Sequence, residues 1–227
     1  TSVEIYDPQT AQWSAGPALP SEVKSGNAIT VDGMILLVGG QNSSNQHLSQ
    51  VLQYDPSTNQ WSQKAPMLTP RYGMKLVLLA GKVWAIGGEG NAGHLDKVEI
   101  YDVTNDSWST GPALTTARLL PSVWASNGRI YVAGGVGDGS SFLNSVEVYD
   151  PDANQWIPTN GLPQNKYRAG TAVIGGKAYI LGGRCASGVF TNKVFAAKLP
   201  PPAKHLYFKD GNATAEAANS PTEVSAG

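Results

Sequence analysis

The segment that decides the fold covers residues 129–156 and reads RIYVAGGVGDGSSFLNSVEVYDPDANQW. An apolar run ends at the diglycine Gly134-Gly135, and a polar loop follows it. The next four residues, Val146 to Tyr149, alternate between apolar and polar side chains with the period of a β-strand. A turn containing Asp and Pro then leads to Trp156. The segment therefore predicts short antiparallel strands joined by tight turns and loops.

The same pattern occurs four times along the chain. The first glycines of the four diglycines are separated by 48, 47 and 48 residues, and a Tyr followed seven residues later by a Trp recurs with the same spacings. The diglycines are Gly39-Gly40, Gly87-Gly88, Gly134-Gly135 and Gly182-Gly183. The aromatic pairs are Tyr6 with Trp13, Tyr54 with Trp61, Tyr101 with Trp108, and Tyr149 with Trp156. The chain is thus an array of one structural unit.

Each unit predicts a four-stranded antiparallel sheet, with strands a to d. In the third copy, strand a is Leu120–Ser126, Asn127-Gly128 is a two-residue hairpin turn, and strand b is Arg129–Gly135. Strand c is Ser145–Tyr149, and Trp156 opens strand d. One such sheet cannot bury both of its faces, so successive sheets must pack around an axis as the blades of a propeller do.

Strands c and d come first in the chain. Three whole units follow, and then strands a, b and c of a last unit. Two arrangements remain open at this point: part of a larger ring, or a small ring closed by pairing of the two ends.

The order of apolar run, diglycine, Tyr and Trp closely resembles the kelch repeat. The resemblance covers residues 1–198 and includes the phrases Ser145–Pro151 and Ala65–Arg71. It implies an all-β propeller of five to seven blades, with one repeat per blade. The last copy departs from the pattern, because Ala197 occupies the Tyr position and no Trp follows. Residues 199–227, which begin in a proline run, are predicted to be a linker or disordered tail.

Composition excludes several classes of function. Only 15% of the 227 residues are charged, and 16 Lys and Arg balance 17 Asp and Glu, whereas a nucleic-acid binder usually shows a basic excess. No apolar stretch approaches the roughly 18 residues of a membrane span. The sequence therefore predicts a soluble folded domain with neither nucleic acid nor a membrane as its partner.

The loops joining b to c and d to a should emerge on one side of every blade, where a rigid scaffold presents them for binding. We predict a rim of cations just before each strand a, formed by Lys24, Arg71, Arg118 and Arg168. Further candidates on the same loop face are Arg184, Glu89 and Asp138. Resemblance to kelch adaptor proteins implies that such groups receive an acidic protein or peptide segment, with a carbohydrate as the second choice.

The histidines invite a metal interpretation, but packing is the simpler one. His47 and His94 align with Phe142 and Phe190 in the b-to-c loops, and a position filled by either His or Phe is more typical of packing than of ligation. No cofactor or metal site is predicted.

An enzymatic alternative comes from within the kelch family, in the form of a secreted carbohydrate-active propeller. A galactose-oxidase-like copper site would need Cys185, the one cysteine of the chain, together with His and Tyr ligands. A sialic acid mutarotase-like site would need Glu89, Arg168 and Arg184 to converge. We favour a non-catalytic binding module. The compartment is left open between an extracellular location, which we weakly prefer, and a cytoplasmic adaptor. Sequons at Asn42, Asn105 and Asn212 do not decide it, because such triplets arise often by chance in Asn- and Ser-rich sequence.

Overall fold

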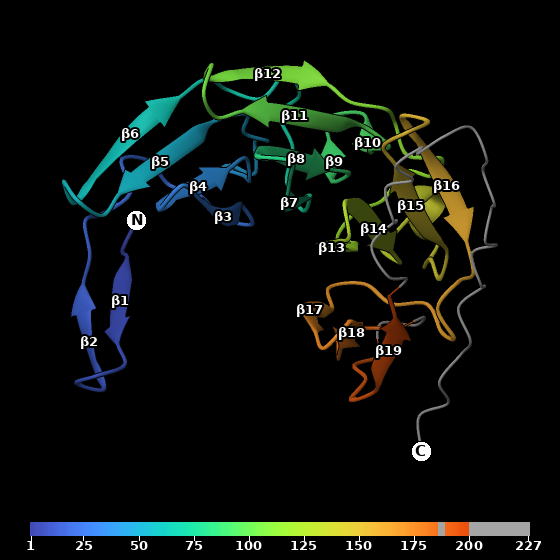
Figure 1. The fold of residues 1–227 in the computed structure, drawn as a ribbon. Coiled ribbons are helices and arrows are strands. Elements are labelled where there is room, and N and C mark those ends of the chain that lie inside the picture. Colours follow the sequence, from blue (N-terminus) through green and yellow to red (C-terminus); the bar gives the residue numbers. More distant parts are fainter. Residues whose placement is uncertain (186–188, 200–227) are drawn as a thin grey trace, which may run out of the picture.

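The structure is a computed structural model that describes residues 1–185 and 189–199. Its antiparallel sheets follow one another along an arc (Figure 1), and the first strand of each whole sheet lies toward the inside of the arc. The all-β propeller predicted from the repeats is confirmed. No helix in the described part of the chain has the length and apolar character needed to cross a membrane.

Three sheets have four strands each and form whole blades. Blade I consists of β3 (Asn27–Val31), β4 (Met34–Val38), β5 (Val51–Asp55) and β6 (Gln60–Lys64). Blade II consists of β7 (Lys75–Leu79), β8 (Lys82–Ile86), β11 (Val98–Asp102) and β12 (Ser107–Thr110). Blade III consists of β13 (Ser122–Ser126), β14 (Arg129–Ala133), β15 (Val146–Asp150) and β16 (Gln155–Thr159). In each blade, hydrogen-bonded neighbours follow the order a, b, c, d.

The end sheets are incomplete, as the strand pattern predicts. The N-terminal sheet has β1 (Glu4–Asp7) and β2 (Gln12–Ala15), and blade IV has β17 (Gly170–Ile174), β18 (Lys177–Leu181) and β19 (Val194–Lys198). The loops add a small hairpin of β9 (Glu89–Gly90) and β10 (Gly93–His94) and a 3-10 turn at Asp138–Ser140, neither of which was predicted. The proposed boundary at residue 198 stays a prediction, because residues 200–227 lie outside the described residues.

The Tyr and Trp of each repeat join one blade to the blade before it. In blade III the rings of Tyr149 and Trp156 lie 5.5 Å apart, and Trp156 Nε1 donates a hydrogen bond to the Pro112 carbonyl of blade II at 2.9 Å. Trp108 and Trp61 repeat this bond at the two preceding junctions. A buried indole N–H needs an acceptor, so the repeated Trp both fills the wedge between blades and sets their spacing.

The diglycine occurs where the backbone of the following loop approaches most closely. Gly134 has φ +64°, and a Cβ there would lie 2.2 Å from the carbonyl oxygen of Lys166. Gly182, its counterpart in blade IV, has φ +60° but would meet nothing closer than 3.6 Å. The first glycine of the doublet is therefore needed for its conformation at every copy, and for space only where another blade follows. The second glycine lacks space for a Cβ even in blade IV, where a Cβ on Gly183 would lie 2.8 Å from the Tyr167 carbonyl oxygen.

The hydrophobic core lies between blades. Val83 and Ala85 of β8 face the junction of blades I and II, and Ile86 and Ile130 pack at the junction of blades II and III. All four side chains are completely buried. Because each junction has its own cluster, the core is a series of interfaces and not one central mass.

The two ends of the arc have open faces. Trp13 is 66% exposed, whereas its counterpart Trp156 is 5% exposed, and Leu181 is 41% exposed where its counterpart Ile86 is fully buried. Among the described residues no hydrogen-bonded pairing joins β1–β2 to β17–β19, and Figure 1 shows the two sheets well apart. Closure by pairing of the ends, one of the two arrangements left open by the sequence, is not observed.

Candidate functional site

Short bridges between loops build the predicted binding face. Tyr72 pairs with Glu89, Tyr167 pairs with Arg184, and Arg184 pairs in turn with Phe190. Equivalent bridges occur around Gln41 and Val136. Each d-to-a loop thus lies against the b-to-c loop of its own blade. We call the surface made by these loops the loop face.

The predicted ring of four exposed cations is wrong at two positions. Arg71 and Arg118 have no exposed surface at all. Arg118 Nη1 donates to the carbonyls of Gly134 and Ser145 at 2.8 and 2.9 Å. Its guanidinium therefore ties the segment before strand a to the end of strand b and the start of strand c of the same blade, and it is not available to a ligand.

Each buried arginine has a buried acid as its counter-ion. Arg118 Nη2 lies 2.8 Å from Oε1 of Glu147, and Arg71 Nη2 lies 2.8 Å from Oε1 of Glu99. The second oxygen of Glu147 accepts the backbone N–H of Thr115 at 2.6 Å. At Arg118 every guanidinium nitrogen donates a hydrogen bond, so the buried charges and polar atoms of that pair find partners. At Arg71 the charges are equally close, but Nε has no hydrogen-bond partner among the described residues.

The repeat itself predicts these pairs once positions are counted back from the diglycines. Sixteen residues before each first glycine stand Val23, Arg71, Arg118 and Lys166. The facing position of strand c holds Leu52, Glu99, Glu147 and Phe195 in the same order. Acid and arginine therefore occur together, and are absent together. Lys24 and Arg168, which we had placed in one ring with the arginines, lie one and two residues further along the repeat.

Lys166 shows how the motif changes where the acid is absent. Its ammonium group donates to the carbonyls of Gly182 and Lys193 at 2.9 and 2.7 Å and lies 4.4 Å from the centre of the Phe195 ring. Burial lowers the pKa of the Lys166 amine. The cation is thus held by carbonyl dipoles and a ring face, which are weaker counterparts than a carboxylate.

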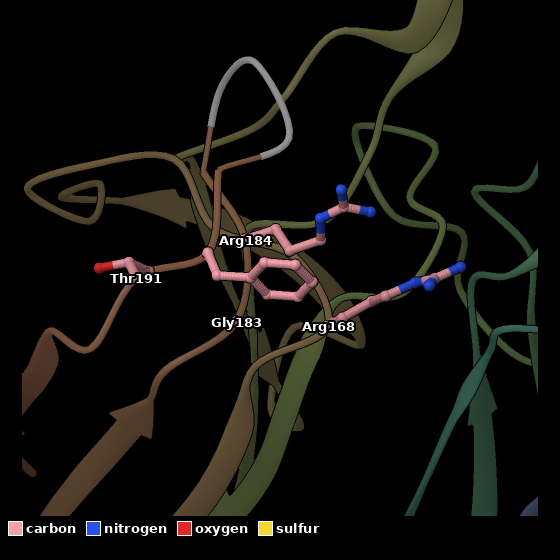
Figure 2. Close-up of a pocket in the computed structure, with 5 residues that line it drawn as sticks. Arg168, Gly183, Arg184 and Thr191 are labelled. Atoms are coloured by element: carbon pink, nitrogen blue, oxygen red, sulfur yellow. The ribbon is translucent and has the colours of Figure 1, made fainter.

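Four of the predicted loop-face residues do reach the surface or its edge. Lys24 and Asp138 are exposed, and the Lys24 ammonium group donates to the side chain of Asn45. Arg168 is exposed and Arg184 is half-buried, and both line a cavity of about 380 Å³ with Gly183, Phe190 and Thr191. Figure 2 shows both arginine side chains extending in the same direction, away from Thr191.

Aromatic rings support this cavity, a role that was not predicted from the sequence. The Arg184 guanidinium carbon lies 4.7 Å from the centre of the Phe190 ring and 5.9 Å from that of Tyr167. Tyr167 also stacks on Phe142, with ring centres 5.1 Å apart. The signal available in the sequence was Tyr or Leu directly after each buried cation position. We call Arg168, Arg184 and Phe190 the cationic pocket.

Glu89, the other predicted candidate, lies in a separate polar cluster on blade II. Its Oε2 accepts the hydroxyl of Tyr72 at 2.9 Å and lies 3.5 Å from Nε2 of His94. Burial and the Glu89 carboxylate raise the pKa of Tyr72, while the positive charge of Arg168 opposes that increase. The structure therefore does not gather Glu89 into the cationic pocket, although Arg168 is near enough for its charge to act on Tyr72.

The histidine loops pack as the His/Phe alignment indicated. The His47 ring stacks on Tyr72 with centres 5.3 Å apart, the arrangement that Phe142 makes with Tyr167 in blade III. His94 Nδ1 lies 2.8 Å from the Gly137 carbonyl. In residues 1–185 and 189–199 no three His, Cys, Asp or Glu side chains come together in a way that could hold a metal ion. Cys185, a free thiol, lies 3.4 Å from the Val189 carbonyl.

Comparison with known sequences agrees with this architecture. The model of the KLHDC2/KLHL20/DRC7 Kelch-repeats domain matches residues 1–183. The chain belongs to the kelch-repeat family. The resemblance read from the diglycines and the Tyr-Trp pairs is thereby confirmed.

Individual kelch proteins match over shorter stretches. Kelch-like ECH-associated protein 1A of Danio rerio is 34% identical over 96 residues, covering 41% of this chain and 16% of that protein. Kelch-like protein 42 of Homo sapiens is 36% identical over 87 residues, covering 36% of this chain and 17% of that protein. The match therefore spans less than a fifth of the length of these relatives.

A solved structure, that of YjhT, matches with a TM-score of 0.77 over 87% of this chain and 73% of that chain. Sequence identity is only 19%, so the likeness bears on the fold alone. Fold and function are separate matters in propellers, because the loops carry the function.

Proposed function

We propose that this kelch propeller is a non-catalytic binding module that recognises an acidic segment of a protein or peptide on its loop face. The observation that carries the proposal is the cationic pocket. There, two arginines from adjacent loops line one cavity beside a Phe190 ring that is 77% exposed. Guanidinium groups bind carboxylates through charge-assisted and often bidentate hydrogen bonds.

The exposed ring favours a peptide over a sugar or a small anion as the ligand. Solvent-exposed aromatic side chains beside arginines are typical of protein interfaces, where the ring packs on apolar surface and the arginine supplies polar contacts. A kelch domain of a Kelch-like protein has the same blade plan, which is consistent with an adaptor role. The buried Arg71 and Arg118 have no part in this site.

The test uses an array of fluorescent heptapeptides in which one central Glu is flanked by apolar residues, with the matching Gln peptides alongside. Fluorescence anisotropy gives Kd for the wild type and for the double variant Arg168→Ala/Arg184→Ala. We expect Glu peptides to bind and Gln peptides to bind at least about tenfold more weakly, because a hydrogen bond to a charged group contributes about 1.5–3 kcal/mol. The double variant should lose the preference for Glu.

A matched control removes two positive charges from the same blade but from the other end of its strands. Lys177 and Lys198 are both exposed and face each other across β18 and β19. Lys177→Ala/Lys198→Ala should leave peptide binding unchanged. Equal weakening by both double variants would mean that net charge, and not the cationic pocket, is responsible. Binding of a sugar acid in place of the Glu peptides would contradict peptide recognition.

A further inference from the structure

The loop face carries a fixed carboxylate as well as the cationic pocket. Glu89 begins the short strand β9, and its side chain is 29% exposed. Its Oε2 is engaged by the hydroxyl of Tyr72 at 2.9 Å and lies 3.5 Å from His94 Nε2. Within residues 1–185 and 189–199, no side chain or backbone group hydrogen-bonds the other oxygen, Oε1. One oxygen thus anchors the carboxylate, and the second remains an acceptor.

Groups from three blades hold this carboxylate in place. A carbonyl only accepts hydrogen bonds, so Nδ1 of His94 donates to Gly137 of blade III, and this bond orients the ring with Nε2 toward Glu89. On the other side, the Tyr72 ring is held by stacking on His47 of blade I. Such support preorganises a binding group, because little side-chain freedom is left to lose when a ligand arrives.

Arg168 belongs to the cationic pocket, and its charge also acts on Tyr72, whose hydroxyl donates to Glu89. Its backbone is left-handed, with φ +55°, and its N–H donates to Leu120, whose own N–H donates to Gly73. These bonds link the starts of three blades along the inside of the arc. The Arg168 side chain therefore starts from the inner rim, and Figure 2 shows it extending away from Thr191 toward the green ribbon of the preceding blades. The opposing effect of its charge on the pKa of Tyr72 agrees with this position.

We propose that the loop face selects a dipolar peptide segment, in which an acidic side chain enters the cationic pocket and a Lys or Arg side chain of the same segment pairs with Glu89. This inference rests on the proposed function and adds a specificity rule to it. Glu89 attracts an ammonium or guanidinium group to Oε1 and repels a second acid. Opposite charges at two places on one face also fix the direction in which an extended peptide lies.

The experiment uses three sets of fluorescent peptides that share one Glu. Each peptide has one other variable position, which holds Lys, Gln or Glu in the three sets. A Gly-Ser spacer of two to six residues separates this position from the shared Glu. Anisotropy titrations give Kd for the wild type, Glu89→Gln and Glu89→Lys. The amide oxygen of Gln can still accept the Tyr72 hydroxyl, so Glu89→Gln should retain the local fold. Asp152→Asn, an exposed acid in the turn at the opposite end of blade III, is the matched control.

At one spacer length or more, the wild type should bind the Glu/Lys peptide at least about fivefold more tightly than the Glu/Gln peptide. Glu89→Gln should abolish this ratio without changing the Kd of the Glu/Gln peptide. Glu89→Lys should reverse it in favour of the Glu/Glu peptide, and Asp152→Asn should preserve it. A Glu/Lys preference that survives in Glu89→Gln, or no such preference in the wild type, would overturn the inference.

The two proposals fail in different ways. If Glu peptides bind and depend on Arg168 and Arg184 but ignore Glu89, the acidic-peptide proposal stands and the dipolar rule is overturned. If no peptide of any set binds, both are overturned.

Discussion

Removal of one buried arginine is the sharpest test of how the strands of one blade are held together beneath the loop face. In Arg118→Met the side chain keeps its approximate length but loses the hydrogen bonds to Gly134, Ser145 and Glu147. Glu147, only 1% exposed, then keeps the Thr115 N–H as its hydrogen-bond donor but has no counter-ion. Breaking a buried ion pair by removal of one partner costs about 3–5 kcal/mol.

This cost is large against the 5–15 kcal/mol by which domains are typically stable. For a chain of this size, about 1 kcal/mol shifts Tm by roughly 2–4 °C, so we expect a decrease of about 6–20 °C. Urea denaturation followed by tryptophan fluorescence gives the free energy of unfolding directly. The surface pair of Arg129 and Asp150, 3.5 Å apart, supplies the control: Arg129→Met should cost less than about 1 kcal/mol.

The decisive comparison is the double variant Arg118→Met/Glu147→Leu, because blade I already has the apolar residues Val23 and Leu52 in these places. We expect it to recover most of the lost stability, since no buried charge remains. A single variant within 1 kcal/mol of the wild type, or a double variant less stable than the single one, would refute the account of these pairs as coupled.

Two further predictions concern the backbone and the pH response. Gly134→Ala should destabilise the protein by several kcal/mol, because its Cβ would lie 2.2 Å from a carbonyl oxygen. Gly182→Ala and Gly128→Ala have no atom nearer than 3.6 Å to the new Cβ, so they should cost only the strain of a left-handed φ. Equal losses of stability in thermal melts of the three variants would contradict this prediction. The pKa of Asp106 is lowered most by the hydrogen bond from the Tyr101 hydroxyl, and to a smaller extent by a backbone N–H and by Lys64. The Asp106 carboxylate therefore stabilises the fold at pH values above its unfolded pKa, and this contribution is lost as the pH falls through the folded pKa. Asp106→Asn keeps an acceptor for the hydroxyl and should therefore show a smaller loss of stability between pH 7 and pH 3, measured by urea midpoints; identical pH profiles would contradict the assignment.

The repeat made most of the fold predictable. Gly134 and Trp156 recur at spacings of 47 or 48 residues, and each has a role that depends on its residue type. Gly134 adopts a positive φ against a neighbouring backbone, and the indole of Trp156 reaches the preceding blade. The short hairpin at Glu89–His94 was missed because two glycines in a polar loop carry no strand signal.

The candidate site was predictable only in part. Arg168 and Arg184 were named from the sequence and do line one cavity, whereas Arg71 and Arg118 were named on the same grounds and are buried. Residue type does not distinguish these cases, because an arginine is favourable in water and is also tolerated inside a protein when an acid and several carbonyls surround it. What distinguishes the buried arginines in the sequence is a glutamate 28 or 29 residues further on, Glu99 for Arg71 and Glu147 for Arg118.

The sequence by itself thus determined the blade plan, since periodic glycines and aromatic pairs specify sheets that must stack on one another. It also contained the pairing of Arg with Glu in blades II and III and their joint absence in blades I and IV. The tertiary structure alone decided that Arg168 and Arg184 line one cavity and that Glu89 lies in a separate cluster on the loop face. The physical reason is that these sites form between loops whose sequences do not repeat, so their distances in space do not follow from positions in the repeat.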